Sequence, residues 1–422
     1  MALLEIRDLR SYYRVRKGEV KAVDGVDFHV DEGQTVGLVG ESGCGKTTMA
    51  FAVLGLLPSN ARIATGEIRF RGELVYRAPL TAELRWYLDH GAPWEEMARL
   101  IERRQLSLEG DRHLESAEQL GPLFDAEASV LEDLQKELGE AHASPEALRE
   151  ALKVFLDRKD RSLGRNYWRK LEKRVIERRL ETLRWSEISM IFQAAMNAFN
   201  PVYRVGDQIE EALETHMKMT PEERKKRVEE LFQLVGMHKE RAEGYPHEFS
   251  GGMKQRAMIA MALACNPDLI LADEPTTALD VIMQDRILGE IRDLQRELHL
   301  AMIVITHDIS VVAEVSNRIV IMYAGEVAEE GLTEEVFERP AHPYTMGLLE
   351  AFPSVKGPKK VLKAIPGSPP DLVDPPPGCR FHPRCRFVQP QCAKDAPPLV
   401  EVTPGHRAHC HFAMDIFGGK GP

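Results

Sequence analysis

The sequence predicts an α/β protein built on a parallel sheet, and two observations support this fold class. Short apolar runs at Thr35–Val39, Leu269–Ala272 and Met302–Ile305 have the length and composition of buried strands. Stretches with helical spacing separate these runs, among them Thr47–Leu57 and Asp280–Leu298. Strands that alternate with helices indicate parallel pairing through crossover connections.

Composition and charge narrow the class of protein further. The chain has 422 residues, of which 43% are hydrophobic, and this is enough to exclude a wholly disordered chain. Its 55 Lys and Arg against 66 Asp and Glu give a net charge of −11, which disfavours a protein that coats nucleic acid. No apolar run approaches the ~18 residues of a membrane-spanning helix, and no secretory signal is apparent. We expect a soluble, cytosolic chain with no nucleic-acid partner.

The remaining elements of the expected core follow in order along the chain. Alternating apolar and polar residues predict half-buried strands at Leu3–Arg10 and Val23–Val30. The other expected elements are strands at Gly66–Phe70 and Ser186–Gln193, a mainly helical region at Val205–Gly236 and a helix at Gly252–Ala264.

A charged segment of different composition interrupts the series of strands and helices between residues 78 and 184. Apolar residues near its end recur at the three- and four-residue steps of a helical face: Trp168, Leu171, Val175, Ile176, Leu180 and Leu183. Residues 81–150 carry 7 Lys or Arg and 17 Asp or Glu, a balance of −10, whereas residues 151–180 carry 11 and 4, a balance of +7. We expect four or five helices. Three roles stay open: a solvated bundle, a basic contact for anionic lipid headgroups, or a contact for a partner subunit.

A glycine-rich loop carries the first chemical motif. Gly40-Glu-Ser-Gly-Cys-Gly-Lys46-Thr47 fits the pattern G-x-x-x-x-G-K-[ST], and it follows a strand and opens a helix, as that pattern requires. Its N–H groups and the helix N-terminus favour bound phosphate, while Lys46 would reach the β- and γ-phosphates and Thr47 would ligate Mg²⁺. The expected nucleotide contacts in this loop are Gly40, Glu41, Ser42, Gly43, Cys44, Gly45, Lys46, Thr47 and Thr48.

A second motif is an acidic pair at the end of an apolar strand. Leu269–Ala272 runs directly into Asp273 and Glu274. Such a strand delivers one carboxylate to the metal ion that accompanies the phosphates and the other to an attacking water. Together with the glycine-rich loop, the pair predicts that Asp273 helps to hold Mg²⁺ and that Glu274 acts on water.

A third motif points to a particular family. Phe249-Ser250-Gly-Gly-Met253 resembles the signature motif of ATP-binding cassette ATPases, usually Leu-Ser-Gly-Gly-Gln, and a serine and two glycines that open a helix form an anion site. The resemblance implies a P-loop ATPase core with an N-terminal antiparallel β subdomain and an α-helical subdomain. It also implies that Ser250, Gly251 and Gly252 contact ATP held by a second subunit.

The resemblance assigns roles to further residues, in the order in which the family has them. Gln193 resembles the Q-loop glutamine, which implies a contact with Mg²⁺, and Thr277–Asp280 resembles the D-loop, with Asp280 as an ATP contact. His307 resembles the switch histidine that holds the γ-phosphate. Tyr13 lies where the family has an aromatic ring that stacks on adenine, with Tyr12 as the competing residue. The catalytic set that the resemblance implies is Lys46, Gln193, Glu274 and His307.

The carboxyl-terminal part is similar to the ATP-binding subunits of dipeptide and oligopeptide permeases. The similarity rests on His342-Pro-Tyr-Thr345, on Gly378-Cys-Arg-Phe-His-Pro-Arg-Cys385 and on Ser250-Gly-Gly-Met-Lys-Gln-Arg256. It implies an ATP-driven importer at the cytoplasmic face of the membrane, whose other parts are a second ATPase subunit, two permease subunits and an extracytoplasmic binding protein. Ala194–Phe199 departs from the usual continuation of the Q-loop. The resemblance implies dipeptides or oligopeptides as the cargo, with oligosaccharides or nickel chelates as alternatives.

Four of the six cysteines lie close to the end of the chain, behind a Pro-rich linker. Four thiolates suit Zn²⁺ or an iron–sulfur cluster, and in a cytosolic chain a local group favours metal over disulfides. The permease resemblance implies a [4Fe–4S] cluster here, with Zn²⁺ or thiols without metal as alternatives. The expected ligands are Cys379, Cys385, Cys392 and Cys410, with His382, His406, His409 and His411 as substitutes.

These motifs divide the chain into four parts. Residues 1–77 and 185–335 form the ATPase core, residues 78–184 form the inserted helical block, and residues 336–422 form an irregular extension with the cysteines. Chromosome-maintenance and recombination-repair ATPases are a rival class, because they carry coiled-coil arms between the same motifs. The block ends before Gln193 and lacks sustained heptads, which favours the transporter.

Overall fold

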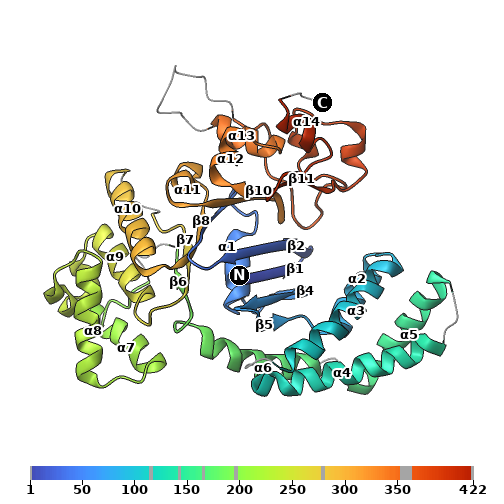
Figure 1. The fold of residues 1–422 in the computed structure, drawn as a ribbon, viewed down its shortest axis with the longest axis horizontal. Coiled ribbons are helices and arrows are strands. Elements are labelled where there is room, and N and C mark those ends of the chain that lie inside the picture. Colours follow the sequence, from blue (N-terminus) through green and yellow to red (C-terminus); the bar gives the residue numbers. More distant parts are fainter. Residues whose placement is uncertain are drawn as a thin grey trace.

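The computed structural model describes residues 2–113, 117–140, 144–163, 167–193, 198–276, 281–351 and 364–419. Two sheets form its centre, one of four strands and one of eight. Figure 1 shows helices α7–α9 at one end of the molecule and helices α2–α5 at the other, with the sheets between them. The arrangement confirms an α/β fold class.

The smaller sheet is antiparallel and has the strand order β2-β1-β4-β5. Its strands are β1 (Ala2–Val15), β2 (Gly18–Asp31), β4 (Ala61–Phe70) and β5 (Glu73–Arg77). Leu4 and Ile6 of β1 are buried and alternate with less buried residues, but the register of β1 against β2 shifts between Ile6 and Leu9, so the expected alternation is only partly present. β5 is an addition that the pattern does not indicate, because its five residues carry a charge at each end.

The larger sheet has the order β11-β12-β10-β9-β3-β8-β7-β6, and its strands from β9 to β6 pair in parallel. Every residue of β3, β7 and β8 is buried, as in strands covered on both faces, and the three predicted buried strands are confirmed. The strands are β3 (Thr35–Val39), β6 (Ile188–Ile191), β7 (Leu269–Asp273), β8 (Ala301–Thr306), β9 (Arg318–Tyr323), β10 (Glu326–Leu332), β11 (Leu399–Thr403) and β12 (His406–His409).

Helices complete the core around the larger sheet. They are α1 (Lys46–Val53), α7 (Val205–His216), α8 (Pro221–Leu234), α9 (Gly251–Ala262), α10 (Val281–Leu298) and α11 (Ile309–Val315), with short 3₁₀ helices at Lys239–Glu243 and Pro246–Glu248. A reciprocal capping box of Thr220 and Glu223 fixes the start of α8. Across the described ranges, no helix is long and apolar enough to cross a membrane.

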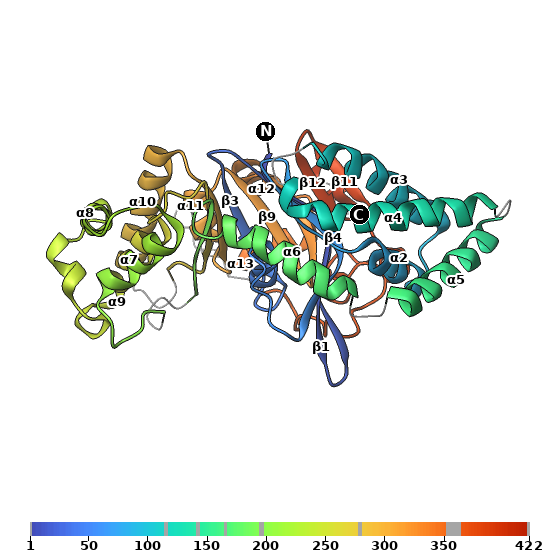
Figure 2. The same ribbon diagram turned by 90° about the horizontal axis from the view of Figure 1, so that it is seen from below.

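The charged block between β5 and β6 folds into five helices with their own apolar core. They are α2 (Leu80–Asp89), α3 (Trp94–Asp111), α4 (Ala117–Glu140), α5 (Pro145–Leu163) and α6 (Tyr167–Leu183). Figure 2 shows α6 running from this bundle back towards the larger sheet. Val175 of α6 packs in the bundle core, whereas Ile176, Leu180 and Leu183 pack in the core of the two sheets. α6 therefore ties the bundle to the rest of the molecule.

The carboxyl-terminal region corrects one expectation. It was expected to be irregular, but β11 and β12 form a hairpin that extends the larger sheet, with β12 paired to β10. The hairpin has too few residues for its alternation to stand out, and pairing with the open edge of β10 decides its structure. The other elements are α12 (Thr333–Glu338), α13 (Pro343–Ala351), α14 (Ala413–Phe417) and 3₁₀ helices at His382–Arg384 and Pro390–Ala393.

Candidate functional site

The predicted chemical residues meet at one edge of the larger sheet. Gly40 follows β3, Asp273 ends β7, and His307 comes directly after β8. These three strands are parallel neighbours, so their carboxyl ends lie side by side. Gln193 follows the end of β6, the next strand along. Open α/β sheets bind their ligands outside this edge, so the fold gathers the predicted motifs at a ligand site.

The glycine-rich loop fits tightly against its neighbours. Gly45, directly before α1, has a φ of 108°, and a Cβ built on it would lie 2.0 Å from the carbonyl oxygen of Ala22. A Cβ on Gly40 would lie 2.2 Å from the carbonyl oxygen of Met322 in β9. Only glycine fits at these two positions, because any side chain would push the loop off the sheet.

Lys46 lies folded inside this loop. Its side chain is buried, and its Nζ donates to the carbonyl oxygens of Gly40 at 2.7 Å and Glu41 at 3.2 Å. A buried ammonium needs such partners. Cys44 is also buried, which raises the pKa of its thiol, so it is a neutral small residue of the loop. The ammonium group of Lys46 therefore lies inside the loop that is expected to bind phosphate.

Asp273 and Thr47 form a pair that fits a divalent cation. Asp273 is buried, and burial raises the pKa of its carboxyl group, while a hydrogen bond from the Thr47 hydroxyl opposes that rise. Within the described residues, Oδ1 of Asp273 is buried and has no hydrogen-bond partner. A buried oxygen in this state is costly, and a hard cation such as Mg²⁺ satisfies it. These two side chains therefore fit the predicted metal.

Glu274 is the centre of a second group. Nε2 of Gln193 donates to its Oε2 at 2.7 Å, and Nδ1 of His307 lies 2.9 Å from its Oε1. Glu274 also has a φ of 47°, a strained value that persists in functional sites when the surrounding structure holds it. Glu274, which is predicted to act on water, is thus in direct contact with the predicted Mg²⁺ contact Gln193 and with His307, the predicted holder of the γ-phosphate. Gln193 reaches Glu274 here rather than Asp273, and residues 194–197 lie outside the described part of the chain.

Two motifs are expected to face a second subunit, and the structure describes the first of them, Ser250–Gly252. Ser250 is exposed and caps the N-terminus of α9, where its hydroxyl accepts from the N–H of Met253 at 3.4 Å. Gly252 packs closely against α10, because a Cβ on it would meet the Met283 side chain at 2.5 Å. The resulting helix N-terminus is open to an anion from outside the chain. Thr277–Asp280, with the predicted contact Asp280, lies outside the described residues.

The two tyrosines that compete for the adenine differ in their surroundings. Tyr12 is 1% exposed and its hydroxyl donates to Asp24 at 2.5 Å, so it is a core residue of the small sheet. Tyr13 is half-buried, and its hydroxyl lies 3.0 Å from the Thr48 hydroxyl at the start of α1. Of the two tyrosines, only Tyr13 is partly exposed and contacts the residue that follows the glycine-rich loop, so Tyr13 remains the candidate for base stacking.

Two contacts with the loop were not foreseen from the sequence. Glu41 forms an ion pair with Arg384, and its N–H donates to the Tyr344 hydroxyl. Both partners belong to sequence patterns that were read only as family markers. Nothing in the local sequence signals a contact between residues 343 positions apart.

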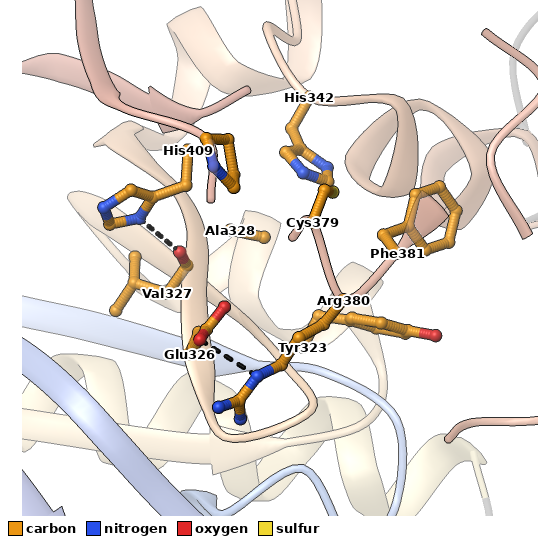
Figure 3. Close-up of a pocket in the computed structure, with 10 residues that line it drawn as sticks. Tyr323, Glu326, Val327, Ala328, His342, Cys379, Arg380, Phe381 and His409 are labelled. Atoms are coloured by element: carbon orange, nitrogen blue, oxygen red, sulfur yellow. Dashed lines mark hydrogen bonds and ion pairs between the residues drawn. The ribbon is translucent and has the colours of Figure 1, made fainter. Parts of the chain in front are cut away.

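The four carboxyl-terminal cysteines lie around a single apolar pocket. Cys379, Cys385, Cys392 and Cys410 line it together with aromatic rings, among them Phe381. Figure 3 shows Cys379 beside His342 and Phe381 in the adjoining pocket. His382 and His411 also line the cysteine pocket, whereas His406 is buried against Glu329 and His409 bonds to the carbonyl oxygen of Val327.

Burial raises the pKa of three of these thiols. It raises the pKa of Cys379 to about 11 and that of Cys410 to about 12, and it also raises the pKa of Cys385. Among the residues that the structure describes, no group of three or more His, Cys, Asp and Glu side chains is arranged to hold a metal ion. The fold therefore brings the four cysteines together around one pocket without forming a finished metal site.

Comparisons with known proteins agree with the geometry of the site. The family model described as ABC transporter matches residues 23–277, and that described as oligopeptide/dipeptide transporter, C-terminal region, matches residues 328–392. The oligopeptide transport ATP-binding protein OppD of Bacillus subtilis is 35% identical, over 96% of this chain and 87% of its own length. OppD of Escherichia coli is 35% identical over 97% and 93%, and the probable peptide ABC transporter ATP-binding protein y4tR of Sinorhizobium fredii is 34% identical over 98% and 96%.

Proposed function

The chain belongs to the ATP-binding subunits of ABC transporters, in their oligopeptide/dipeptide branch, and on that premise we propose that it hydrolyses ATP to energise peptide import. The observation that carries the proposal is the meeting of three groups of residues at one sheet edge. They are the glycine-rich loop, the Thr47–Asp273 pair, and the group of Glu274, Gln193 and His307. A phosphate site, a cation site and a water-activating group are the parts that phosphoryl transfer to water requires.

The side chains have separate tasks in this proposal. Lys46 leaves the carbonyl oxygens of Gly40 and Glu41 to neutralise charge on the β- and γ-phosphates. Glu274 accepts a proton from the attacking water, and Gln193 and His307 orient its carboxylate. Thr47 and Asp273 would hold Mg²⁺, which supplies positive charge beside the phosphates when bound.

The assembly follows from the family. We propose that Ser250, Gly251, Gly252 and Asp280 complete the ATP site of a second, paralogous ATPase subunit, and that Tyr13 stacks on adenine. Two permease subunits carry the cargo, fed by an extracytoplasmic binding protein, with this chain at the cytoplasmic face of the membrane. The relatives are named for oligopeptide transport, which favours peptides over oligosaccharides or nickel chelates as cargo. Their matches span nearly the full chain and disfavour a chromosome-maintenance role.

Transport by the reconstituted complex tests this proposal. We expect that this chain, co-purified with the permease subunits encoded near its gene and placed in proteoliposomes with the binding protein, takes up a labelled oligopeptide when MgATP is supplied. MgADP in its place is the matched control and should give no uptake. ATP-dependent uptake of a labelled oligosaccharide or nickel chelate, without peptide uptake, would contradict the peptide assignment but not the ATPase.

We further propose that Cys379, Cys385, Cys392 and Cys410 ligate a [4Fe–4S] cluster. Their common pocket supports this proposal, since it is lined by all four thiols and by aromatic rings that exclude water. Protonated, buried thiols are poor ligands, and a bound metal would deprotonate them. Small movements of the four side chains would be needed on binding, because they are not arranged to hold a metal as they stand.

Anaerobic purification tests the cluster. We expect a brown protein with broad absorbance near about 400 nm, the signature of iron–thiolate chemistry. Cys392→Ser should lower the iron content severalfold, whereas Cys265→Ala, which removes a buried thiol far from the pocket, should leave it unchanged. A colourless protein with one bound zinc would contradict the cluster and support the zinc alternative.

A further inference from the structure

The second residue of the glycine-rich loop is held by the carboxyl-terminal region. Both carboxylate oxygens of Glu41 accept from the Arg384 guanidinium, at 2.6 and 3.0 Å. The backbone N–H of Glu41 donates to the Tyr344 hydroxyl at 3.0 Å. The loop is thus bound, through one residue, to two side chains more than 300 positions away.

These partners are themselves fixed. The Arg384 side chain is 6% exposed, its Nε donates to the carbonyl oxygen of Pro366 at 2.8 Å, and its Nη1 lies 3.3 Å from the Tyr323 hydroxyl. Tyr344 is fully buried, and its ring lies 4.6 Å from that of Tyr323. A partly buried two-pronged pair between preset groups is stronger and more directional than an ion pair between fully exposed side chains.

A second attachment reaches the loop at Cys44. The N–H of Gly325, in the turn between β9 and β10, donates to the Cys44 carbonyl oxygen at 3.1 Å. Arg380 holds this turn, because its Nη1 donates to the carbonyl oxygen of Ala324 at 2.5 Å and its Nε pairs with Glu326 at 2.9 Å (Figure 3). The carboxyl-terminal region therefore supports the loop at two points, directly at Glu41 and through the β9–β10 turn at Cys44, which lie on either side of Gly43.

The support lies next to the group that binds phosphate. The carbonyl oxygen of Glu41 accepts from Nζ of Lys46, so the same residue joins the phosphate-binding lysine to Arg384. We propose that Arg384 and Tyr344 are positioning residues that hold the glycine-rich loop in its ATP-binding shape, so that the carboxyl-terminal region sets ATP affinity. The inference rests on the nucleotide site proposed above and adds a control of that site from a distant part of the chain.

Binding of a fluorescent, non-hydrolysable ATP analogue with Mg²⁺ to the full chain tests the inference. Arg384→Gln removes the two-pronged pair, and we expect the dissociation constant to rise roughly tenfold, as for loss of a charge-assisted hydrogen bond. Tyr344→Phe removes one hydroxyl from a ring that stays packed, and it should give a smaller rise. Arg386→Gln is the matched control, since Arg386 makes an equally two-pronged pair with Glu350, at 2.8 Å, away from the loop.

A double-mutant cycle separates positioning from general destabilisation. Glu41→Gln alone should weaken binding as Arg384→Gln does, and the double variant should be no weaker than either single variant, because both remove the same pair. Additive losses, or unchanged affinity in both Arg384→Gln and Tyr344→Phe, would overturn the inference. A wild-type chain that binds no analogue would overturn the nucleotide site itself, whereas a wild-type chain that binds while the variants equal it would overturn only the positioning role.

Discussion

Replacement of Glu274 by Gln is expected to lower ATP turnover by about 100-fold or more while MgATP still binds. Glutamine keeps the size of the side chain and an oxygen that accepts from Gln193, so the group around it stays assembled. An amide cannot accept a proton from water, so the step that depends on the carboxylate is lost. Binding depends instead on the loop, which the substitution does not touch.

Two assays on the purified ATPase check this result, phosphate release and equilibrium binding of MgATP. Asp268→Asn is a matched control, because Asp268 precedes the opposite end of β7 and pairs with Arg71 at 2.7 Å at the surface. It should retain wild-type turnover. Wild-type phosphate release by Glu274→Gln would contradict the role of Glu274 as the group that activates water.

The parts of the fold that could be predicted are those with a local cause. Thr35–Val39 and Leu269–Ala272 are apolar runs of strand length, and each is followed by its own chemical motif. A parallel sheet then brings the carboxyl ends of such strands to one edge by topology alone. The phosphate loop, the acidic pair and His307 could therefore be assembled without a structure.

The parts that escaped prediction depend on distant partners. β11 and β12 are strands because the edge of β10 is available to them, and their own sequence does not require it. The pairing of Glu41 with Arg384 joins two residues that each belong to a recognised motif, but neither motif indicates that the two residues meet. Long-range pairing of this kind has no periodicity to reveal it.

The contact between the inserted helical bundle and the small sheet is a further feature that could not be predicted from the sequence. The spacing of its apolar residues predicts helices, but nothing in the sequence indicates that charged residues are buried where the bundle meets the small sheet. Arg77 of β5 is 1% exposed and pairs with Asp111 of α3 at 2.6 Å, and Arg104 of α3 pairs with Glu127 of α4 at 2.7 Å. Buried pairs of this kind lose much stability when one partner is removed, because the other charge is left without a partner.

Replacement of Lys46 by Met is expected to weaken MgATP binding by about 100-fold, which corresponds to about 2.7 kcal/mol, and to abolish measurable turnover. Methionine keeps the buried aliphatic stem, so the loop should retain its packing, but the positive charge that faces the phosphates is lost. Lys239→Met is the control, since Lys239 pairs with Glu229 at the surface, at 3.3 Å. Equilibrium binding and thermal unfolding of the same samples separate a lost phosphate contact from a lost fold.

The Lys46 and Glu274 variants together distinguish MgATP binding from ATP hydrolysis. If the geometry is correct, Lys46→Met fails at binding, while Glu274→Gln binds MgATP and fails at hydrolysis. The two side chains act at different points of the sheet edge, the end of β3 and the end of β7, so neither loss should reproduce the other. MgATP binding at wild-type strength by Lys46→Met would contradict the phosphate site, because no other described cation donates to the carbonyl oxygens of Gly40 and Glu41.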